Sequence, residues 1–253
     1  MIDSHCHLDA CPSPAEAAAP ELLAMVTVGT DSASNLASLE LARRLSNVFA
    51  AVGIHPNNAS DAKDAGVREE VEQQASNPQV VALGETGFDT YWDKESLADQ
   101  LKAFNWQAEL ARHLGKALIL HVRDKDGSEE ASRTAAHAIR EVGYPRGILH
   151  CFNGHPELLH AGLELGWMIS FAGNLTYRRS QAIQQAARQV PQEQLLVETD
   201  SPYLAPVPKR GGRNTPAFVR FTAAFLAKLR ALEPEVLEKL TDENAVRVYR
   251  LDL

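Results

Sequence analysis

The feature that most constrains the fold of this chain is an alternation of short apolar runs with helix-like segments from end to end. Eight aliphatic or β-branched runs are spaced along the 253 residues. Runs this short and apolar are typical of parallel strands that are covered on both faces. We expect strands at residues 2–7, 25–28, 48–54, 80–84, 117–121, 147–150, 167–171 and 195–198.

Side chains that can bind metal ions stand at the ends of several of these runs. His5 and His7 lie two residues apart, so strand alternation places both on one face and turns Cys6 to the other. The strands of a (β/α)8 barrel all end at one mouth, where their terminal side chains meet. We therefore expect one α/β domain over residues 1–253, a single TIM-like (β/α)8 barrel with a metal site at the C-terminal mouth of the strands. The candidate ligands are His5, His7, Glu85, His121, His150 and Asp200.

The alternative architecture is a doubly wound open sheet. It fits less well, because ligands carried by at least five strands would not converge on one point there. Apolar residues at spacings of three and four predict a helix near residues 97–114 and another near 218–232. A last helix is expected at residues 234–249, and no Gly/Ser-rich linker divides the chain.

The composition is that of a globular protein without a membrane span. Apolar residues make up 45% and charged residues 23%, and no run reaches the roughly 20 apolar residues of a membrane helix. The first residues lack the basic and apolar regions of a signal peptide, so we expect a cytoplasmic protein. We also expect a monomer. Cys6, Cys11 and Cys151 lack CxxC spacing, so we expect reduced thiols. Cys6 and Cys151 neighbour proposed ligands and could supply a thiolate, but strand alternation favours buried bystanders.

The charge limits the ways in which this chain can bind nucleic acid. A net charge of −8 without a long Lys/Arg run argues against tight non-specific binding to duplex DNA. A local positive field is still available if the site holds two divalent ions, because their positive charge exceeds the negative charge of two carboxylate ligands. Basic residues also follow strands on the expected active face. Our candidate contacts to a phosphate backbone are Arg123, Arg178, Arg179, Lys209, Arg210 and Arg213.

The ligand set is too large for one zinc ion and fits two divalent ions that are bridged by Glu85. Gly84 and Gly87 flank this carboxylate and leave close backbone clearance for a bridge. Taken singly, Glu85 is also typical of a surface turn, and His5 and His7 of a pair on a surface strand. His121 and His150 are each also typical of a core histidine that is hydrogen-bonded to backbone.

Three further residues keep more than one interpretation. His55 fits a metal ligand, a proton shuttle, a phosphate contact or a loop anchor stiffened by the following proline. Asp3 and Glu198 lie one layer deeper than His5 and Asp200. They fit either carboxylates that orient the histidine ligands or an internal ion pair, and the sequence does not separate the two.

The whole chain resembles the TatD family of metal-dependent deoxyribonucleases, within the amidohydrolase-like barrels. The resemblance runs in the order of the family's motifs. It rests on DSHCHLD at residues 3–9, VGIHP at 52–56, GETGFD at 84–89, HVRD at 121–124, HCFNG at 150–154 and ETDSPYLAP at 198–206, and it extends through 210–216 and 241–244. Departures are mild and leave the ligand count intact: Thr86, Phe88, Val122 and Asn153 differ from the residues usual in the family.

The resemblance implies one metal held by His5, His7 and Asp200, a second held by His121 and His150, and Glu85 between them. It points to magnesium-supported activity, whereas a histidine-rich site favours zinc or manganese, so the metal stays open between Mg, Mn and Zn.

From the residues and the resemblance together we expect metal-dependent hydrolysis of DNA phosphodiesters. The expected activity is that of a 3′→5′ exonuclease on single-stranded or frayed DNA. In this scheme Asp200 orients the attacking water and accepts its proton, and His55 or the second ion stabilises the leaving oxygen. The rival is dinuclear-metal hydrolysis of an amide or ester. It is weakened because Glu85 stands where many such barrels carry a carboxylated lysine, and the nearest downstream lysine is Lys94.

Overall fold

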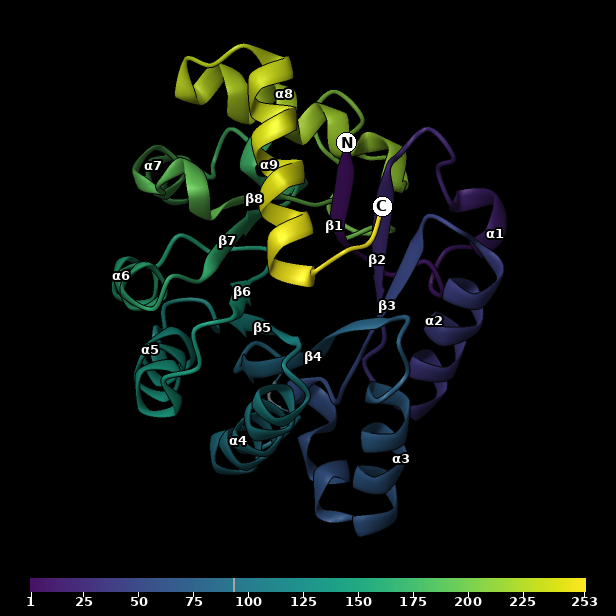
Figure 1. Ribbon diagram of the computed structural model, residues 1–253. Helices are drawn as coiled ribbons and strands as arrows, with labels where there is room; N and C mark the ends of the chain where they lie inside the picture. Colours follow the sequence, from purple (N-terminus) through teal and green to yellow (C-terminus); the bar gives the residue numbers. More distant parts are fainter. Residues whose placement is uncertain (93) are drawn as a thin grey trace.

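A computed structural model describes residues 1–92 and 94–253 of the chain. Its eight strands are all parallel and neighbour one another in sequence order, and Figure 1 shows them surrounded by helices. All eight expected strands are present. Their bounds are β1 Ile2–Cys6, β2 Ala24–Val28, β3 Val48–Val52, β4 Val80–Asp89, β5 Ala117–Arg123, β6 Gly147–Leu149, β7 Met168–Phe171 and β8 Leu195–Val197.

The sheet curls until its first and last strands meet. Ser4 Oγ on β1 donates to Val197 O on β8 over 2.9 Å, and Asp200 N donates to His5 O over 2.9 Å. A third bond across the same seam, from His7 N to Ser201 O, measures 2.7 Å. The predicted (β/α)8 barrel is therefore confirmed, and the open-sheet alternative is wrong.

Helices follow the strands and cover the outside of the barrel (Figure 1). The expected last helix has the predicted bounds, and Ser96 caps the long helix predicted near residues 97–114 by accepting a hydrogen bond from Asp99 N. The α-helices are α1 Pro14–Ala17, α2 Ser32–Arg44, α3 Ala65–Ala75, α4 Leu97–Leu114, α5 Glu130–Val142, α6 Pro156–Glu164, α7 Gln181–Gln189, α8 Val219–Arg230 and α9 Pro234–Tyr249. Short 3-10 segments are η1 Pro56–Lys63, η2 Gly173–Thr176, η3 Gln192–Gln194 and η4 Pro216–Phe218.

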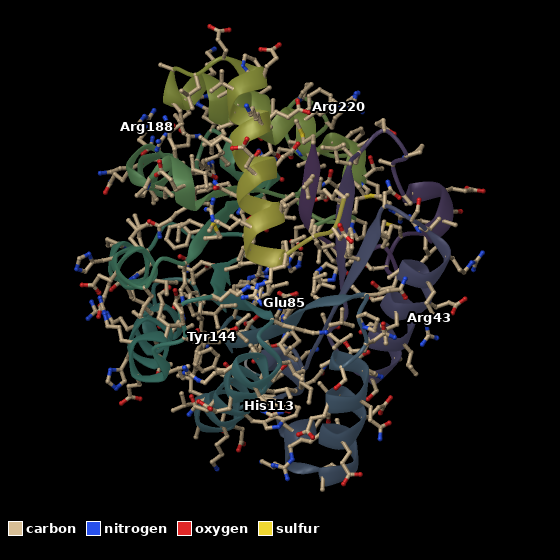
Figure 2. The ribbon with its side chains drawn as sticks, viewed as in Figure 1. Arg43, Glu85, His113, Tyr144, Arg188 and Arg220 are labelled. Carbon is tan, nitrogen blue, oxygen red and sulfur yellow. The ribbon has the colours of Figure 1, made fainter. Side chains whose placement is uncertain are left out.

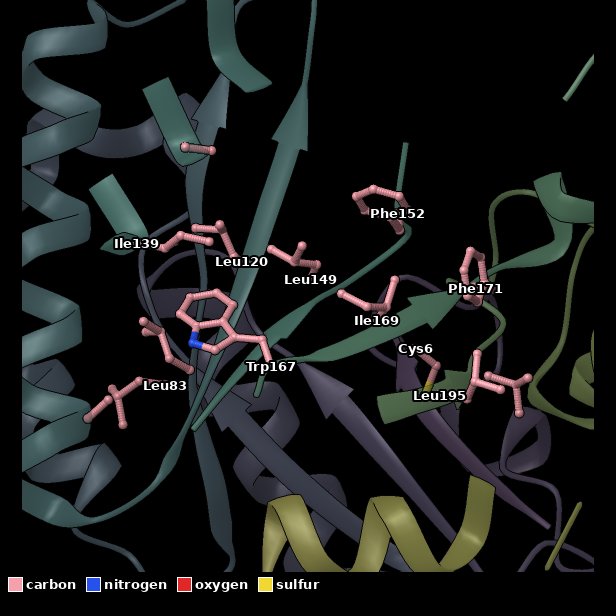
Figure 3. Close-up of a cluster of buried hydrophobic side chains, with 14 of the residues drawn as sticks. Cys6, Leu83, Leu120, Ile139, Leu149, Phe152, Trp167, Ile169, Phe171 and Leu195 are labelled. Atoms are coloured by element: carbon pink, nitrogen blue, oxygen red, sulfur yellow. The ribbon is translucent and has the colours of Figure 1, made fainter. Parts of the chain in front are cut away.

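Strand alternation divides the apolar side chains into two clusters. The outer cluster lies between the strands and the helices, and Figure 3 shows Leu149, Trp167 and Ile169 within it. The inner cluster fills the barrel, and Tyr249 of α9 joins it. Since the Tyr249 hydroxyl donates to Ser4 O over 2.8 Å, α9 covers the end at which the strands begin. This end of the barrel is therefore packed against α9, and the ends of the strands lie at the opposite mouth.

Two strands continue past their expected ends, whereas the other six agree with the expected bounds to within two residues. β4 continues to Asp89, five residues beyond its expected end at residue 84, and β5 continues past His121 to Arg123. Gly84 and Gly87 have φ angles of 114° and 137°, and a Cβ at either position would collide with a backbone oxygen of β5. Only glycine lets β4 pass this close to β5, so what looked like a turn in the sequence is the continuation of the strand.

Candidate metal centre

The six predicted ligands meet inside the mouth of the barrel. In Figure 2 the label of Glu85 lies near the middle of the molecule, whereas Arg43, Arg188 and Arg220 lie at its outside. On β5, Leu118 and Leu120 belong to the outer cluster and Ile119 to the inner one, so alternation turns the following His121 inward. The same alternation turns His150 inward after Leu149.

Glu85 lies at the centre of this group, and its two carboxylate oxygens face different histidines. Oε1 lies 2.6 Å from His121 Nδ1 and 2.9 Å from His150 Nε2. Oε2 lies 3.6 Å from His5 Nε2 and 3.5 Å from His7 Nε2. The carboxylate therefore lies between two sets of ring nitrogens. It is nearly fully buried, at 3% exposure, so little solvent reaches it.

Asp200 completes the set on the side of His5 and His7. Its Oδ1 lies 3.3 Å from His7 Nε2 and 3.8 Å from His5 Nε2. The residue has a φ of 56°, in the left-handed region that Asp tolerates better than most residues. The bond from its backbone N–H to His5 O holds the carboxylate over β1 in this conformation.

Hydrogen bonds fix which ring nitrogen is free to bind a metal in three of the histidines. His7 Nδ1 donates to Val28 O over 2.8 Å, and His150 Nδ1 donates to Glu198 Oε1 over 3.1 Å. In both rings the lone pair is therefore on Nε2, which faces Glu85. His121 is held in the same manner, since its Nε2 lies 3.2 Å from a carboxylate oxygen of Asp89 while Nδ1 faces Glu85.

The two deeper carboxylates have different roles. Glu198 orients His150 and also accepts from Cys151 N over 2.7 Å, so it is a histidine-orienting partner. Asp3 instead accepts hydrogen bonds from Thr199 N over 2.8 Å and from Thr199 Oγ1 over 2.5 Å. It anchors the backbone just before Asp200 and orients no imidazole.

Opposite charges shift the pKa values of these groups. Burial alone would raise the pKa of Glu85, but the charge on His150 and hydrogen bonds from three imidazoles outweigh it, so the Glu85 pKa lies well below its usual value. Burial would lower the pKa of His7, but Asp200 and Glu85 outweigh it and raise that pKa to about 9. Without metal, the charge of the buried carboxylates is therefore balanced by protonated imidazoles, a balance that bound cations would replace.

His55 lies beside this group but in a different tautomer. Its Nε2 is 3.7 Å from Glu85 Oε1, and its ring centroid is 4.5 Å from that of His121. Its Nδ1 accepts a hydrogen bond from Asn57 N over 3.0 Å, so the proton of the neutral ring is on Nε2. Burial and the charge on His121 lower its pKa to about 3. A neutral ring that presents N–H to the site favours the role of a hydrogen-bond donor over that of a metal ligand.

The donor set fits metal ions. Three groups of ligand atoms lie within 4.8 Å of one another, and all three include imidazole nitrogens and a carboxylate. The groups are His5–His7–Asp200, His5–His150–Glu198 and His55–Glu85–His121. The hydrogen bonds described above argue against Glu198 and His55 as ligands. Glu198 Oε1 already accepts a hydrogen bond from His150, and the neutral His55 ring presents N–H to the site.

The three cysteines were expected to be reduced thiols. All three are free thiols. Cys6 points away from the histidines into the outer cluster, where its Sγ donates to Val26 O over 3.4 Å. Burial raises the pKa of the Cys6 and Cys151 thiols, which disfavours a thiolate ligand.

The predicted basic residues lie exposed around the mouth and do not reach the histidine cluster. The Arg123 guanidinium lies 3.7 Å over the ring of Tyr91, and that of Arg210 lies 4.3 Å over the ring of Tyr177. Lys209 packs 5.5 Å from the Phe218 ring. Arg178 and Arg213 are exposed.

Two features of the site were not predicted. Asp89 was quoted only as part of a motif, although it is four residues after Glu85 and so shares its face once β4 is extended. Exposed aromatic rings also border the mouth, among them Tyr203, which is 57% exposed and 6.0 Å from the His7 ring. For the exposed rings, the signal available in the sequence was the adjacent Tyr and Trp that follow β4.

Comparison with known proteins agrees with this geometry. The family described as TatD related DNase matches residues 2–250. The chain belongs to the TatD family of metal-dependent hydrolases. A TatD-family relative from Escherichia coli K12, named uncharacterized metal-dependent hydrolase YcfH, is 37% identical, and the match covers 100% of this chain and 96% of that protein. A relative from Yersinia pseudotuberculosis, named 3′-5′ ssDNA/RNA exonuclease TatD, is 34% identical over 91% of this chain and 89% of that protein.

Solved structures give the same assignment to the TatD family. The crystal structure of YjjV, a TatD homologue from Escherichia coli K12, has a TM-score of 0.87 and 26% identity, and it covers 100% of this chain and 98% of that chain. Among the residues that the model describes, no helix is both long enough and apolar enough to cross a membrane.

Proposed function

We propose that this protein hydrolyses phosphodiester bonds of DNA with two divalent ions, as a 3′→5′ exonuclease on single-stranded or frayed DNA. The observation that carries the proposal is the division of histidines between the two oxygens of Glu85. The name of the Yersinia relative supports the substrate class and the polarity. All the proposed ligands come from one chain, which is consistent with a monomer.

The two ions would have separate ligands and share Glu85. His5, His7 and Asp200 would hold one, and His121 and His150 would hold the other. Bound divalent ions polarise a phosphoryl oxygen and lower the pKa of a coordinated water. The imidazole-rich set favours manganese or zinc over magnesium on ligand chemistry.

Asp200 is suited to orient the attacking water and accept its proton. Burial raises its pKa, but the hydrogen bond and the charge of His7 outweigh burial, so the pKa lies below the usual value and the group is a carboxylate at neutral pH. Its Oδ1 faces the two histidines, which leaves Oδ2 for a water at the mouth. Positioned proton acceptors of this kind contribute about 10²–10⁴-fold to turnover.

His55 is suited to stabilise the leaving oxygen. Its neutral ring presents Nε2–H toward the site, and its low pKa keeps it neutral across the physiological range. A preorganised N–H donor in a water-poor site stabilises negative charge that develops in the transition state. Farther out, the exposed cations would bind the substrate backbone: Arg123, Arg178, Lys209, Arg210 and Arg213.

The proposal is tested by digesting oligonucleotides that carry a label at the 5′ or the 3′ end, as single strands and as duplexes, with Mg²⁺, Mn²⁺ or Zn²⁺. We expect metal-dependent release of mononucleotides from the 3′ end, faster on single strands than on blunt duplexes. A Glu85→Gln variant purified in parallel controls for contaminating nucleases and should be at least ~100-fold slower, because it loses the bridging carboxylate. Turnover of a panel of N-acyl amides and lactones, with intact DNA, would instead favour the amide or ester hydrolase.

A further inference from the structure

Two adjacent aromatic side chains project from the mouth just after β4. Tyr91 is 40% exposed and Trp92 is 55% exposed, and their ring centroids are 5.0 Å apart in a T-shaped arrangement. The Arg123 guanidinium lies 3.7 Å over the Tyr91 ring and 5.6 Å from the Trp92 ring. Single exposed apolar residues are ordinary surface, but here two rings and a cation form one contiguous unit beside the metal centre.

This unit is fixed to the site by one buried side chain. Asp89, which is 1% exposed, accepts hydrogen bonds from Tyr91 N over 2.8 Å and from Trp92 N over 3.1 Å through Oδ1. Its other oxygen lies 3.2 Å from His121 Nε2. One short carboxylate therefore holds both the backbone that carries the aromatic pair and a histidine that faces Glu85, which keeps this segment beside the metal centre.

Arg123 is held by the backbone while its charged end stays accessible. Thr90 N donates to Arg123 O over 2.9 Å, and the β4–β5 register pairs Asp89 with Arg123. Among the salt bridges of residues 1–92 and 94–253, none involves Arg123. A guanidinium stacked flat on a ring keeps its N–H edge free for a phosphate oxygen.

Exposed aromatic rings next to a cation are the features that bind unpaired nucleic acid. Aromatic side chains stack the faces of successive bases, and cations bind the backbone between them. We propose that Trp92 stacks one unpaired base of the substrate strand and that Arg123 binds an adjacent phosphate. This inference rests on the proposed function. It explains why single strands would be preferred over duplexes, since a base inside a duplex already has both faces covered and cannot stack on Trp92.

Steady-state kinetics of the metal-loaded protein can separate base stacking from backbone binding. The substrates are a labelled single-stranded oligonucleotide and a tract of equal length whose residues lack bases. Trp92→Ala should raise KM for the single strand about 5–150-fold, the range that corresponds to ~1–3 kcal/mol per stacked base, with kcat nearly unchanged. On the abasic tract, Trp92→Ala should match the unmodified protein.

Three further variants sharpen the test. Trp92→Phe keeps a ring and should recover most of the lost KM. Arg123→Gln should raise KM on both substrates, because the phosphate is present in both. Val236→Ala is the control for the loss of any exposed apolar side chain and should leave KM unchanged. Val236 is 51% exposed and lies on α9, at the opposite end of the barrel.

The outcomes separate this inference from the proposed function. An unchanged KM for single strands in Trp92→Ala would overturn the stacking role while DNA hydrolysis stands. An equal loss on the abasic tract would also overturn it, because the effect would not depend on bases. Absence of DNA cleavage by the unmodified protein, with full metal content, would overturn both proposals.

Discussion

Glu198 holds the His150 ring in the tautomer that a metal site needs. Glu198 Oε1 accepts from His150 Nδ1 over 3.1 Å, so Nε2 is the nitrogen that faces Glu85 Oε1, 2.9 Å away, and that becomes free for a metal when the ring is neutral. Burial would lower the pKa of His150, but the charges of Glu85 and Glu198 raise it well above its usual value. A buried carboxylate therefore both orients this imidazole and increases its basicity.

The first prediction follows from this pair. Glu198→Gln should weaken metal affinity about 10–100-fold, because the neutral amide is a poorer acceptor for the His150 N–H. Competition with a coloured chelator measures the affinity directly. Glu164→Gln, the same change on a half-exposed carboxylate of α6, should leave the affinity unchanged. Equal affinities in Glu198→Gln and the unmodified protein would show that Glu198 has no role in metal binding.

Asp200→Asn separates proton transfer from metal retention. The amide keeps the size and one coordinating oxygen but removes the basic carboxylate, so kcat should fall about 10²–10⁴-fold with little change in KM. Metal analysis of the same sample should still find the ion held by His121, His150 and Glu85. Near-normal turnover would assign the proton to another group and leave Asp200 as a ligand alone.

The inward direction of two candidate ligands could be predicted from sequence because it depends on strand parity. Once a run is a strand of a barrel, the inward or outward direction of His121 and His150 follows from their neighbours. Asp89 was missed because its strand was expected to end at Gly84, and the positive φ angles that let β4 continue past two glycines are a tertiary effect.

Partners that lie far apart in the chain could not be predicted. Asp3 and Glu198 each lie two residues before a ligand, yet only Glu198 orients an imidazole. Asp3 instead binds Thr199 across the β1–β8 seam, and the β1–β2 register shifts just after it. The tautomer of His55 likewise depends on the path of the backbone at Asn57, which no residue pattern reveals.

Cys6→Ser tests the strand direction. The Cys6 thiol contacts Val26 O in the outer cluster, on the opposite side of β1 from His5 and His7. The number of metal ions bound per chain should be unchanged, as measured by elemental analysis after gel filtration. Loss of an ion from a folded Cys6→Ser protein would show that the thiol faces the metal centre.

Metal binding should strengthen as pH rises through the range in which His7 loses its proton. In the metal-free fold the pKa of His7 is raised from 6.5 to about 9. The stability from its charged form is therefore complete below pH 6.5 and is lost as pH rises toward 9. Since a ligand imidazole must be neutral, the Tm of metal-free protein should fall across this window, while the Tm increase caused by Zn²⁺ should grow. Parallel Tm curves with and without metal would contradict this linkage.

The central claim is that Glu85 lies between two metal ions. Anomalous diffraction from crystals soaked in Mn²⁺ tests it most directly, because the anomalous signal locates manganese independently of the protein atoms. We predict two peaks per chain on opposite sides of the Glu85 carboxylate, one beside His5, His7 and Asp200 and the other beside His121 and His150. A single peak at full occupancy, or two peaks of which neither is coordinated by Glu85, would contradict the account.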